Sequence, residues 1–195
     1  MSIYLARNGK MLTRINGTRS FGEIVSPIPH EAPEEVTIGS QTWKTKNLAI
    51  DDGEGGIYLI DTMGSTQYYY NWSAAVRVAR KVKGWHLPTK VEWETLASEV
   101  GGYDIAGTKL KSTTGWESGP GTDDYGFNAL PVGYCQTPSG SATLDGTGRN
   151  ACFWTATDQN RYSSYYSYMT KESRMYWDFS NNVSWAYSVR LIKDS

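Results

Sequence analysis

Residues 84–101 have the sequence GWHLPTKVEWETLASEVG, the clearest local structural signal in the chain. Thr89 can accept a hydrogen bond at the start of a helix, and Glu92, three residues later, can bond back to it, which is the capping-box pattern. The apolar residues that recur on one helical face are Trp93, Leu96 and Val100. Gly101 suits the left-handed position that ends many helices. The stretch therefore predicts a helix between Thr89 and Gly101 whose tryptophan face is buried.

Upstream, a second helix is predicted in NWSAAVRVARKV, residues 71–82, where Ser73 can cap the first turn. Its apolar stripe consists of Ala74, Ala75, Val78, Ala79 and Val82. Alternation in VTIGSQTWKTKNLA, residues 36–49, predicts a strand at the start of this part of the chain. Its inward residues are predicted to be Val36, Ile38 and Trp43.

After Gly102 the chain becomes rich in Gly, Ser, Thr and Asp, which predicts loops between short strands. The strand-like segments lie around residues 130–135, 151–156, 165–170, 175–179 and 187–192. Large aromatic side chains dominate buried area in most cores. The residues that we expect to pack in the core rather than bind a ligand are Trp85, Leu87, Trp93 and Trp116. The chain from residue 36 to 195 is thus expected to form one domain with two helices and several short strands.

The first 26 residues form a separate part of the chain. They contain IYLARNGKMLTRINGTRSFGEIV, in which two Asn-Gly pairs are flanked by apolar residues, the strongest short hairpin signal. A small β-ribbon is predicted from Ile3 to Val25. Residues 27–35 contain three prolines and no apolar periodicity, which is typical of an extended linker. Because a lone ribbon is marginally stable in water, we expect residues 1–26 to serve attachment or homo-oligomerisation.

Composition bears on the partners that the chain can have. The 195 residues have a formal net charge of −1 and no dense Lys/Arg cluster, so nothing favours nucleic acid as a partner. No apolar run approaches the roughly 18 residues that a membrane span needs, and no signal peptide is evident, so membrane insertion is not expected. Cys135 and Cys152 could form a disulfide or pack as reduced apolar side chains; either role would be structural.

Six phrases in residues 36–194 together resemble a known bacterial family. These phrases are VTIGSQTWKTKNL, GWHLPTKVEWETL, AGTKLKSTTGW, DDYGFNALPVGY, FWTATD and AYSVRLIKDS. They are similar to the paralogous domain first noted in Fibrobacter succinogenes, a branch of the C-type lectin fold. The resemblance implies an α+β, C-type lectin-like fold with two helices packed on short antiparallel sheets, loop-rich and preceded here by the ribbon.

Two further resemblances point to different functions. The phrase from Trp85 to Trp93 is similar to the formylglycine-generating enzyme family, whose oxidase chemistry needs reactive cysteines late in the chain. Cys135 and Cys152 lack that family's flanking pattern. Variable proteins of diversity-generating retroelements also use this fold and place their variable residues near the C-terminus, in a stretch like residues 154–187. Those proteins display a ligand-binding surface on phage tails or bacterial cells.

Other candidate chemistry in the sequence is weak. His86 has no second histidine nearby except His30 in the linker, and a lone histidine is usually structural. Glu117, Asp123 and Asp124 could supply oxygen ligands to calcium, but a loop that caps itself through Asx turns is the better expectation. The calcium- and sugar-binding triplets of C-type lectins, Glu-Pro-Asn, Gln-Pro-Asp and Trp-Asn-Asp, do not occur. We therefore expect no catalytic residue, no metal and no cofactor.

The stretch YSSYYSYMTKESRMYWDFSNNVSWAY, residues 162–187, has the Tyr, Ser and Asn composition of an antibody-like binding surface. The resemblance to retroelement proteins adds a genetic reason, since randomised adenines in Asn codons yield Tyr, Ser, Asn, Asp, Thr or Phe but not Trp, Met, Lys or Glu. The predicted ligand-binding residues are Asp158, Tyr162, Tyr166, Tyr168, Thr170, Tyr176, Asp178, Asn181, Asn182 and Tyr187.

The expected function is therefore non-enzymatic binding of a protein or cell-surface ligand, as an adhesin or receptor-binding protein of a phage virion or bacterial surface. The alternatives are a formylglycine-generating-type enzyme and a structural bacterial surface module. If the tyrosines face solvent, Ser at four of them should hardly change the thermal midpoint. These four are Tyr166, Tyr168, Tyr176 and Tyr187.

Overall fold

A computed structural model describes residues 11–15, 18–22, 34–137, 141–182 and 184–195. The chain divides into two compact units, Met1–Ala32 and Pro33–Ser195. Among the described residues, no helix combines the length and the hydropathy that crossing a bilayer requires.

The described part of the first unit is a pair of antiparallel strands, β1 (Met11–Ile15) and β2 (Thr18–Gly22). Met11 lies opposite Gly22 and Ile15 opposite Thr18. This hairpin lies within the predicted ribbon; the rest of residues 1–26 and most of the linker lie outside the described residues. The role of the ribbon in attachment or assembly stays a prediction.

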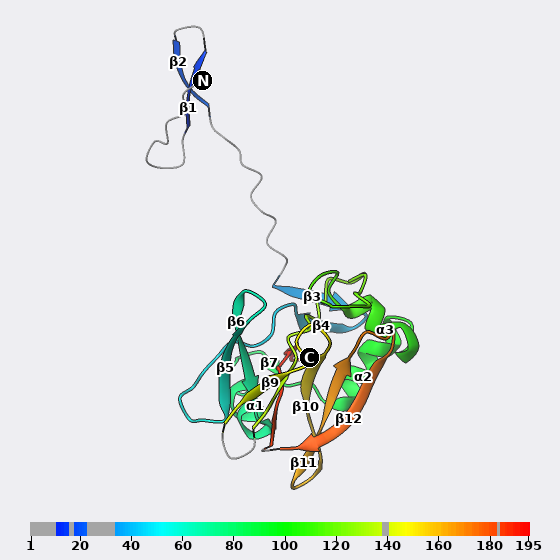
Figure 1. The fold of residues 1–195 in the computed structure, drawn as a ribbon. Helices are drawn as coiled ribbons and strands as arrows, with labels where there is room; N and C mark the ends of the chain where they lie inside the picture. The colour runs from blue at the N-terminus through cyan, green and yellow to red at the C-terminus, as the bar shows by residue number, and fades with distance from the viewer. Residues whose placement is uncertain (1–10, 16–17, 23–33, 138–140, 183) are drawn as a thin grey trace. The chain divides into compact units, whose positions relative to one another are not determined.

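The described residues of the second unit form three helices and twelve strands (Figure 1). The helices are α1 (Trp72–Ala79), α2 (Lys90–Glu99) and α3 (Tyr103–Leu110). The strands are β3 (Glu35–Ile38), β4 (Gln41–Lys44), β5 (Ile57–Thr62), β6 (Ser65–Tyr70), β7 (Trp85–His86), β8 (Tyr134–Gln136), β9 (Thr143–Asp145), β10 (Ala151–Asn160), β11 (Ser163–Met169), β12 (Met175–Asn181), β13 (Trp185–Ala186) and β14 (Ile192–Lys193).

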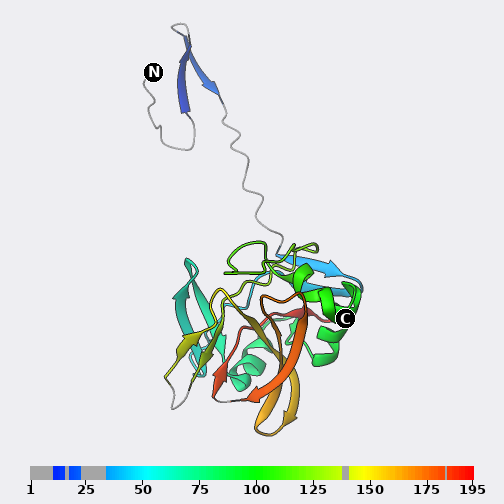
Figure 2. The same ribbon diagram turned by 45° about the vertical axis from the view of Figure 1, so that its right-hand side comes forward.

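These strands form four small antiparallel sheets rather than one large one. Their orders are β3-β4-β14-β7, β5-β6, β13-β8-β9 and β10-β11-β12. The last strand, β14, lies between β4 and β7, so it completes the sheet that β3 and β4 begin. In both ribbon views the β5–β6 hairpin lies on one side and α2 and α3 on the other, with β10, β11 and β12 between them (Figures 1 and 2). The described part of this unit is mixed α/β, and there its sheets stay separate and do not close into a barrel.

Helix α2 has the structure that its sequence predicts. The Thr89 side chain accepts a hydrogen bond from the Glu92 backbone N–H, and the Glu92 carboxylate accepts one from the Thr89 backbone N–H at 2.7 Å. The buried face contains Trp93, Leu96 and Val100. Gly101 follows with a φ of +108°, the backbone region that favours glycine. The capping box and the apolar face are both confirmed.

Helix α1 begins earlier than predicted, because Asn71 rather than Ser73 caps it. The Asn71 side chain accepts a hydrogen bond from the Ala74 backbone N–H at 2.9 Å, and the Ser73 hydroxyl bonds to the same Asn71 oxygen. Both residue types are good caps, and the extended backbone at Asn71 (φ −67°, ψ 164°) selects it. The helix ends at Ala79, so Val82 lies beyond it. Val82 nevertheless packs against the core cluster that contains the buried residues of α1.

The expectation of only two helices is wrong, because residues 103–110 form α3. The local sequence contains few helix signals. The N-cap is Gly102, which offers no side-chain hydrogen bond, and Gly107 lies inside the helix. A Cβ on Gly107 would lie 2.5 Å from the carbonyl oxygen of Arg174. Helix α3 therefore forms because it packs closely against the chain before β12, and this close approach requires glycine at position 107.

The core under the sheets is built from tryptophan and phenylalanine. The Trp93 ring centroid lies 4.9 Å from that of Trp43 and 5.3 Å from that of Phe153. Of the predicted core residues, Leu87, Trp93 and Trp116 are buried. Trp85 is only half-buried, and the Lys44 ammonium lies 4.2 Å from its ring centroid. The predicted packing role is thus confirmed for Leu87, Trp93 and Trp116, while Trp85 packs against the core as a partly buried residue.

A buried guanidinium, Arg190, connects distant loops beneath the C-terminal segment. It donates hydrogen bonds to the carbonyl oxygens of Lys44, Phe127 and Asn128 and to the Asn47 side chain. Burial lowers its pKa to about 9, so it stays charged at neutral pH. Arg190 satisfies backbone acceptors that would otherwise be buried without a partner.

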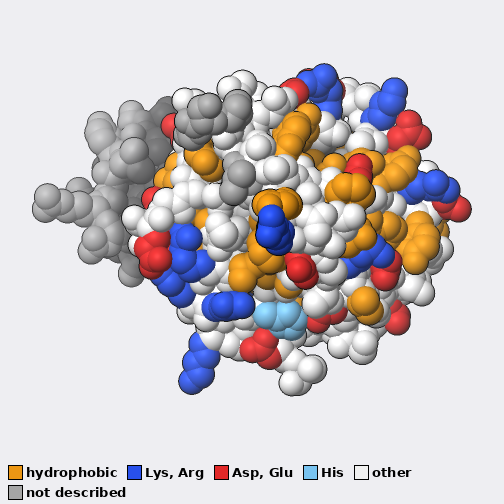
Figure 3. Space-filling view, turned by 90° about the horizontal axis from the view of Figure 1, so that it is seen from below, with side chains coloured by type: hydrophobic (Ala, Val, Ile, Leu, Met, Phe, Trp, Pro, Cys, Tyr) orange, Lys and Arg blue, Asp and Glu red, His pale blue; other side chains and the backbone are white. Residues whose placement is uncertain are grey.

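Charged side chains of both signs lie at the surface. On the face shown in Figure 3, acidic and basic side chains are interspersed, with hydrophobic side chains between them. This mixed distribution agrees with the net charge of −1.

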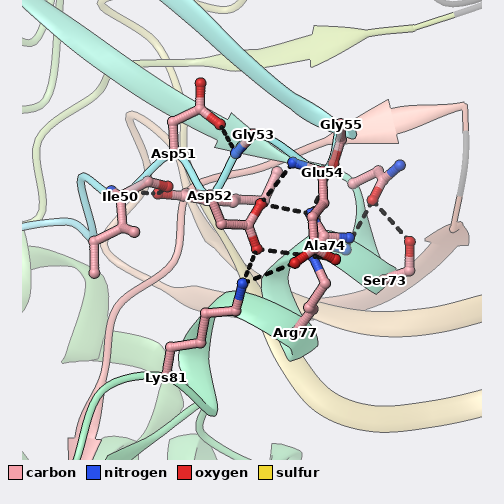
Figure 4. Close-up of polar contacts among 12 residues, drawn as sticks. Ile50, Asp51, Asp52, Gly53, Glu54, Gly55, Ser73, Ala74, Arg77 and Lys81 are labelled. Atoms are coloured by element: carbon pink, nitrogen blue, oxygen red, sulfur yellow. Dashed lines mark hydrogen bonds and ion pairs between the residues drawn. The ribbon is translucent and has the colours of Figure 1, made fainter.

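The loop before β5 is fastened to α1 by a cluster of ion pairs (Figure 4). Asp52 accepts hydrogen bonds from the Arg77 guanidinium at 2.9 Å and the Lys81 ammonium at 2.8 Å. These bonds, that from Arg77 first, hold the pKa of the Asp52 carboxyl well below its usual range. Glu54 pairs with both cations as well. Because every charge in the cluster has a partner within it, the geometry indicates a structural role, which is to hold this loop against the helix.

Candidate functional site

The tyrosine-rich stretch forms one side of the β10-β11-β12 sheet. In the register of β11 and β12, Tyr168 lies opposite Tyr176, and Tyr166 lies opposite Asp178. Residues directly opposite in an antiparallel pair project from the same side. We call these four residues, Tyr166, Tyr168, Tyr176 and Asp178, the tyrosine face. Because side chains alternate along a strand, Tyr166 and Tyr168 lie on the same side of β11.

The rings of the tyrosine face are stacked along the sheet. The ring centroids of Tyr166 and Tyr168 are 5.4 Å apart, and those of Tyr168 and Tyr176 are 5.1 Å apart. All three side chains are half-buried. Stacked aromatic pairs are worth about 0.5–1.5 kcal/mol beyond their buried area. The stack therefore presents a preorganised aromatic surface.

The opposite side of the same strands faces the core. Ser167, Met169 and Met175 are buried there. Trp177 packs edge-on against Tyr103 of α3, with 4.8 Å between the ring centroids. The alternation of β11 and β12 thus separates a side that contains fully buried residues such as Met169 and Met175 from a side whose tyrosine rings are half-buried. This explains why methionine and tryptophan interrupt the polar composition of the stretch.

Tyr187 corrects one expectation, because it is a core residue rather than a solvent-facing one. Its side chain is 3% exposed, and its ring centroid lies 4.5 Å from those of both Trp154 and Tyr166. Its backbone N–H and carbonyl pair with those of Tyr70. Its hydroxyl lies 3.1 Å from that of Ser180. Tyr187 follows β13 and reaches the tyrosine face from beneath.

A hollow of about 480 Å³ opens beside the tyrosine face, and we call it the first hollow. It is lined by Tyr134, Asn150, Cys152, Tyr166, Tyr168, Phe179, Ser180, Asn181, Trp185 and Tyr187. Aromatic residues make up most of this lining, while Asn150, Ser180 and Asn181 add groups that both donate and accept hydrogen bonds. Such a mixture suits recognition of a ligand that is partly apolar and partly polar.

A second hollow of about 510 Å³ adjoins the first, since Tyr134 and Asn150 line both. Its lining consists of Glu117, Ser118, Tyr134, Asp145, Arg149, Asn150, Thr170 and Lys171. The Tyr134 hydroxyl donates to the Asp145 carboxylate at 3.3 Å, and Arg149 pairs with the same carboxylate at 3.1 Å. Tyr134 thus lies between the mostly aromatic lining of the first hollow and the charged lining of the second.

A buried ammonium holds the loop that lines the second hollow. Lys111 donates hydrogen bonds to three carbonyl oxygens, those of Gly119 at 2.6 Å and of Thr170 and Glu172 at 2.9 Å. Burial lowers the pKa of Lys111. A single cation therefore joins the turn between β11 and β12 to the loop after α3, which positions Thr170 and Lys171 at the site.

The structure brings most of the predicted binding residues together. Those that line the first hollow are Tyr166, Tyr168, Asn181 and Tyr187, and Thr170 lines the second. Tyr176 and Asp178 belong to the tyrosine face but line neither hollow. Asn182 follows β12 and is half-buried. Asp158 and Tyr162 line neither hollow. Asp158 lies opposite Ser164, beyond a register shift after Trp154, and Tyr162, 59% exposed, lies beyond the end of β10.

Three residues that line the first hollow were not predicted from the sequence: Tyr134, Asn150 and Trp185. Tyr134 lies on β8, which pairs with β13, so Tyr134 and Trp185 meet with 5.5 Å between ring centroids. No local pattern predicts this pairing across some fifty residues. Trp185 does lie within the tyrosine-rich stretch, but it is not among the predicted ligand-binding residues.

Both cysteines are free and buried, so the expected alternative of a disulfide is not realised. Burial raises the pKa of the Cys135 thiol to about 12 and raises that of Cys152 further. A reactive cysteine needs a stabilised thiolate and access to its partner. These thiols have neither, and both pack as small apolar side chains.

The acidic loop is closed by its own hydrogen bonds. The Asp123 carboxylate accepts a bond from the Asn128 backbone N–H at 2.7 Å, and Asp123 has a φ of +49°. Glu117 lies instead at the second hollow. Within the part of the chain that the structure describes, no three His, Cys, Asp or Glu side chains are grouped so as to hold a metal ion.

His86 has two acidic partners that the sequence did not reveal. Its Nε2 lies 2.8 Å from a Glu92 carboxylate oxygen, and its Nδ1 lies 2.7 Å from an Asp194 carboxylate oxygen. Burial by itself would lower the pKa of His86, but the bonds to Glu92 and Asp194 raise it above its ordinary value. A protonated imidazole can donate to both carboxylates at once. His86 therefore links the start of α2 to the end of the chain.

This bridge predicts that stability falls as pH rises. Because the pKa of His86 is raised in the folded state, its contribution is complete below the unfolded pKa of about 6.5 and is lost as pH increases through the folded pKa. Urea unfolding at pH 5.5 and 8.5 should show this loss for the unaltered chain. His86→Gln should remove most of the difference, while His30→Gln should retain it. An equal pH dependence in His86→Gln would contradict the assignment.

The comparisons with known proteins give one match. The model of a family described as the Fibrobacter succinogenes major domain matches residues 36–193. No curated protein and no solved structure matches the chain.

Proposed function

The chain belongs to the Fibrobacter succinogenes major domain family, and from this premise we propose that residues 36–195 are a non-enzymatic, C-type lectin-like binding domain. Its ligand is a protein or a cell-surface component, and the binding surface is the tyrosine face together with the two adjacent hollows. The observation that supports this proposal most directly is the stacked aromatic surface beside a hollow of about 480 Å³.

The chemistry of this surface suits protein recognition. Tyrosine offers a large contact area with few rotatable bonds, and serine and asparagine supply adaptable hydrogen bonds. Asn150, Ser180 and Asn181 lie next to the rings at the first hollow. Because the rings are already stacked against one another, little entropy is lost when a ligand covers them.

We further propose that the domain is the variable protein of a diversity-generating retroelement, with residues 154–187 as its variable region. The accessible side of β11 and β12 contains Tyr and Asp, which randomised adenines can produce, whereas the buried side contains Met169 and Met175, which they cannot. On this proposal the protein acts on a phage tail or a bacterial surface. A near-copy of the DNA for residues 154–187, beside a reverse-transcriptase gene and differing at adenines, is the expected genomic finding.

Binding is favoured over chemistry of the formylglycine-generating kind by the state of the cysteines. Cys152 lines the first hollow, but it is 4% exposed, and burial raises its pKa. Cys135 is fully buried on β8. A thiol oxidase would need at least one accessible thiolate.

A binding experiment tests the proposal. The purified chain is applied to a panel of intact bacterial cells and purified envelope proteins, and saturable binding to at least one is expected. The double variant Tyr168→Ser/Tyr176→Ser should weaken that binding at least about thirtyfold, because the loss of even one aromatic hot spot often costs about 2 kcal/mol or more. Binding is measured by cytometry and biolayer interferometry.

Tyr103→Ser provides the matched control. Tyr103 is 49% exposed and packs against the other side of the same sheet, so its loss should leave binding unchanged. Circular dichroism must show that all variants are folded. Equal binding by the double variant and the unaltered chain, or no saturable binding across the panel, would contradict the proposal.

A further inference from the structure

The first hollow combines many aromatic rings with an absence of positive charge. Six of its ten lining residues are aromatic, and none of the ten has a charged side chain at neutral pH. Aromatic rings have negative faces, so a group of them attracts cations more than it attracts anions. A cation that enters this hollow would meet no like charge on its walls.

A carboxylate beside the hollow adds to this preference. Asp178 lies opposite Tyr166 in the sheet register and is exposed. One of its oxygens accepts a hydrogen bond from the neighbouring Phe179 N–H, and it forms no ion pair with any residue that the structure describes. Burial raises the pKa of Tyr168, and the Asp178 charge adds to that increase, which agrees with their proximity. Asp178 is thus a free counter-ion at the aromatic surface.

The other end of the tyrosine face already contacts a cation in this way. The Arg174 guanidinium lies 5.9 Å from the ring centroid of Tyr176 and is also bonded to the Asp104 carboxylate. A cation between an aromatic ring and a carboxylate is therefore part of the native surface. The rings line the first hollow, the Asp178 carboxylate lies opposite one of them in the sheet, and the protein supplies no cation of its own there among the described residues.

We propose that the first hollow receives a lysine or arginine side chain of a protein ligand, held by the aromatic rings and by Asp178. This inference rests on the proposed function, because it names the chemistry that the binding domain recognises. A polypeptide suits the site better than an isolated ammonium compound, because the adjoining second hollow offers both charge signs. Glu117 and Lys171 are exposed there and can pair with further side chains of an extended segment.

Defined probes test the inference without knowledge of the natural ligand. N-acetyl-lysine methylamide and N-acetyl-arginine methylamide are compared with the neutral N-acetyl-norleucine methylamide by NMR titration of the full chain. The cationic probes should bind at least about tenfold more tightly than norleucine, within the range that desolvated cation–π contacts and an ion pair provide. Resonances of Tyr166, Tyr168 and Asn150 should shift.

Two carboxylate variants locate the effect. Asp178→Asn should reduce the preference for the cationic probes about fivefold and leave norleucine binding unchanged. Asp61→Asn removes an exposed carboxylate of the β5–β6 hairpin that lines neither hollow, and it should keep the full preference. Both residues are exposed, so both variants should fold like the unaltered chain.

The inference is overturned if norleucine binds as tightly as the cationic probes, if none of the probes binds, or if Asp178→Asn retains the full preference. Tighter binding of tetramethylammonium than of either cationic probe would also overturn it, by pointing to a quaternary ammonium ligand. These outcomes differ from failure of the proposed function. Capture of a cell-surface ligand without a cation preference removes only this inference, while probe binding without any such capture removes only the proposed function.

Discussion

Trp93→Ala is expected to destabilise the domain by about 3–5 kcal/mol, which is enough to unfold a marginally stable protein. The Trp93 ring is fully buried, and its centroid lies within 6 Å of those of Trp43, Phe127 and Phe153. Removing the Trp93 ring opens a cavity where α2 meets two sheets. The neighbouring rings of Trp43, Phe127 and Phe153 belong to different segments of the chain, so they can move into this cavity only partly. Urea unfolding followed by tryptophan fluorescence and circular dichroism measures the loss.

Val91→Ala is the matched control for Trp93→Ala. Val91 lies on the same helix and is 66% exposed, so its truncation should change stability by less than about 0.5 kcal/mol. A loss below about 1 kcal/mol for Trp93→Ala would show that α2 does not depend on its tryptophan face.

Tyr187→Ser is expected to cost about 3 kcal/mol or more, although Tyr187 belongs to the tyrosine-rich stretch. The substitution removes a buried ring that contacts both Trp154 and Tyr166, and it leaves a cavity beneath the tyrosine face. It also removes the hydroxyl bonded to Ser180. Thermal and urea unfolding of the purified variant test this directly.

Two further substitutions separate the parts of the Tyr187 effect. Tyr187→Phe deletes only the hydroxyl and should cost about 1 kcal/mol. Tyr168→Ser removes a half-buried ring of the tyrosine face and should cost less than Tyr187→Ser, because less of its ring is buried. If Tyr187→Ser and Tyr168→Ser prove equally stable, Tyr187 does not belong to the core.

The exposure of these residues also changes the expectation for the fourfold serine variant. Removing Tyr166, Tyr168, Tyr176 and Tyr187 together was expected to leave the midpoint almost unchanged. With Tyr187 in the core, the fourfold variant should unfold more easily for a reason unrelated to the ligand. A binding study should therefore vary Tyr168 and Tyr176, whose rings stack on the surface, and leave Tyr187 intact.

The features that could be predicted from the sequence are those that depend on near neighbours along the chain. The capping box at Thr89 and Glu92 is formed by residues three apart, so the pattern predicts both its hydrogen bonds and the buried face of α2. Alternation along a strand is equally local, and it accounts for Tyr166 and Tyr168 lying on the opposite side of β11 from Met169. The family match over residues 36–193 agrees with the resemblance that the six phrases indicated.

The tertiary structure alone decided which distant segments meet. Helix α3 lacks a side-chain cap and forms against the chain before β12, where only glycine fits at position 107. The pairing of β8 with β13 brings Tyr134 to Trp185, and the packing of Tyr187 on Trp154 turns a predicted surface tyrosine into core. Burial depends on contacts between segments far apart in sequence, and a local pattern of tyrosines is the same whether its rings face water or tryptophan.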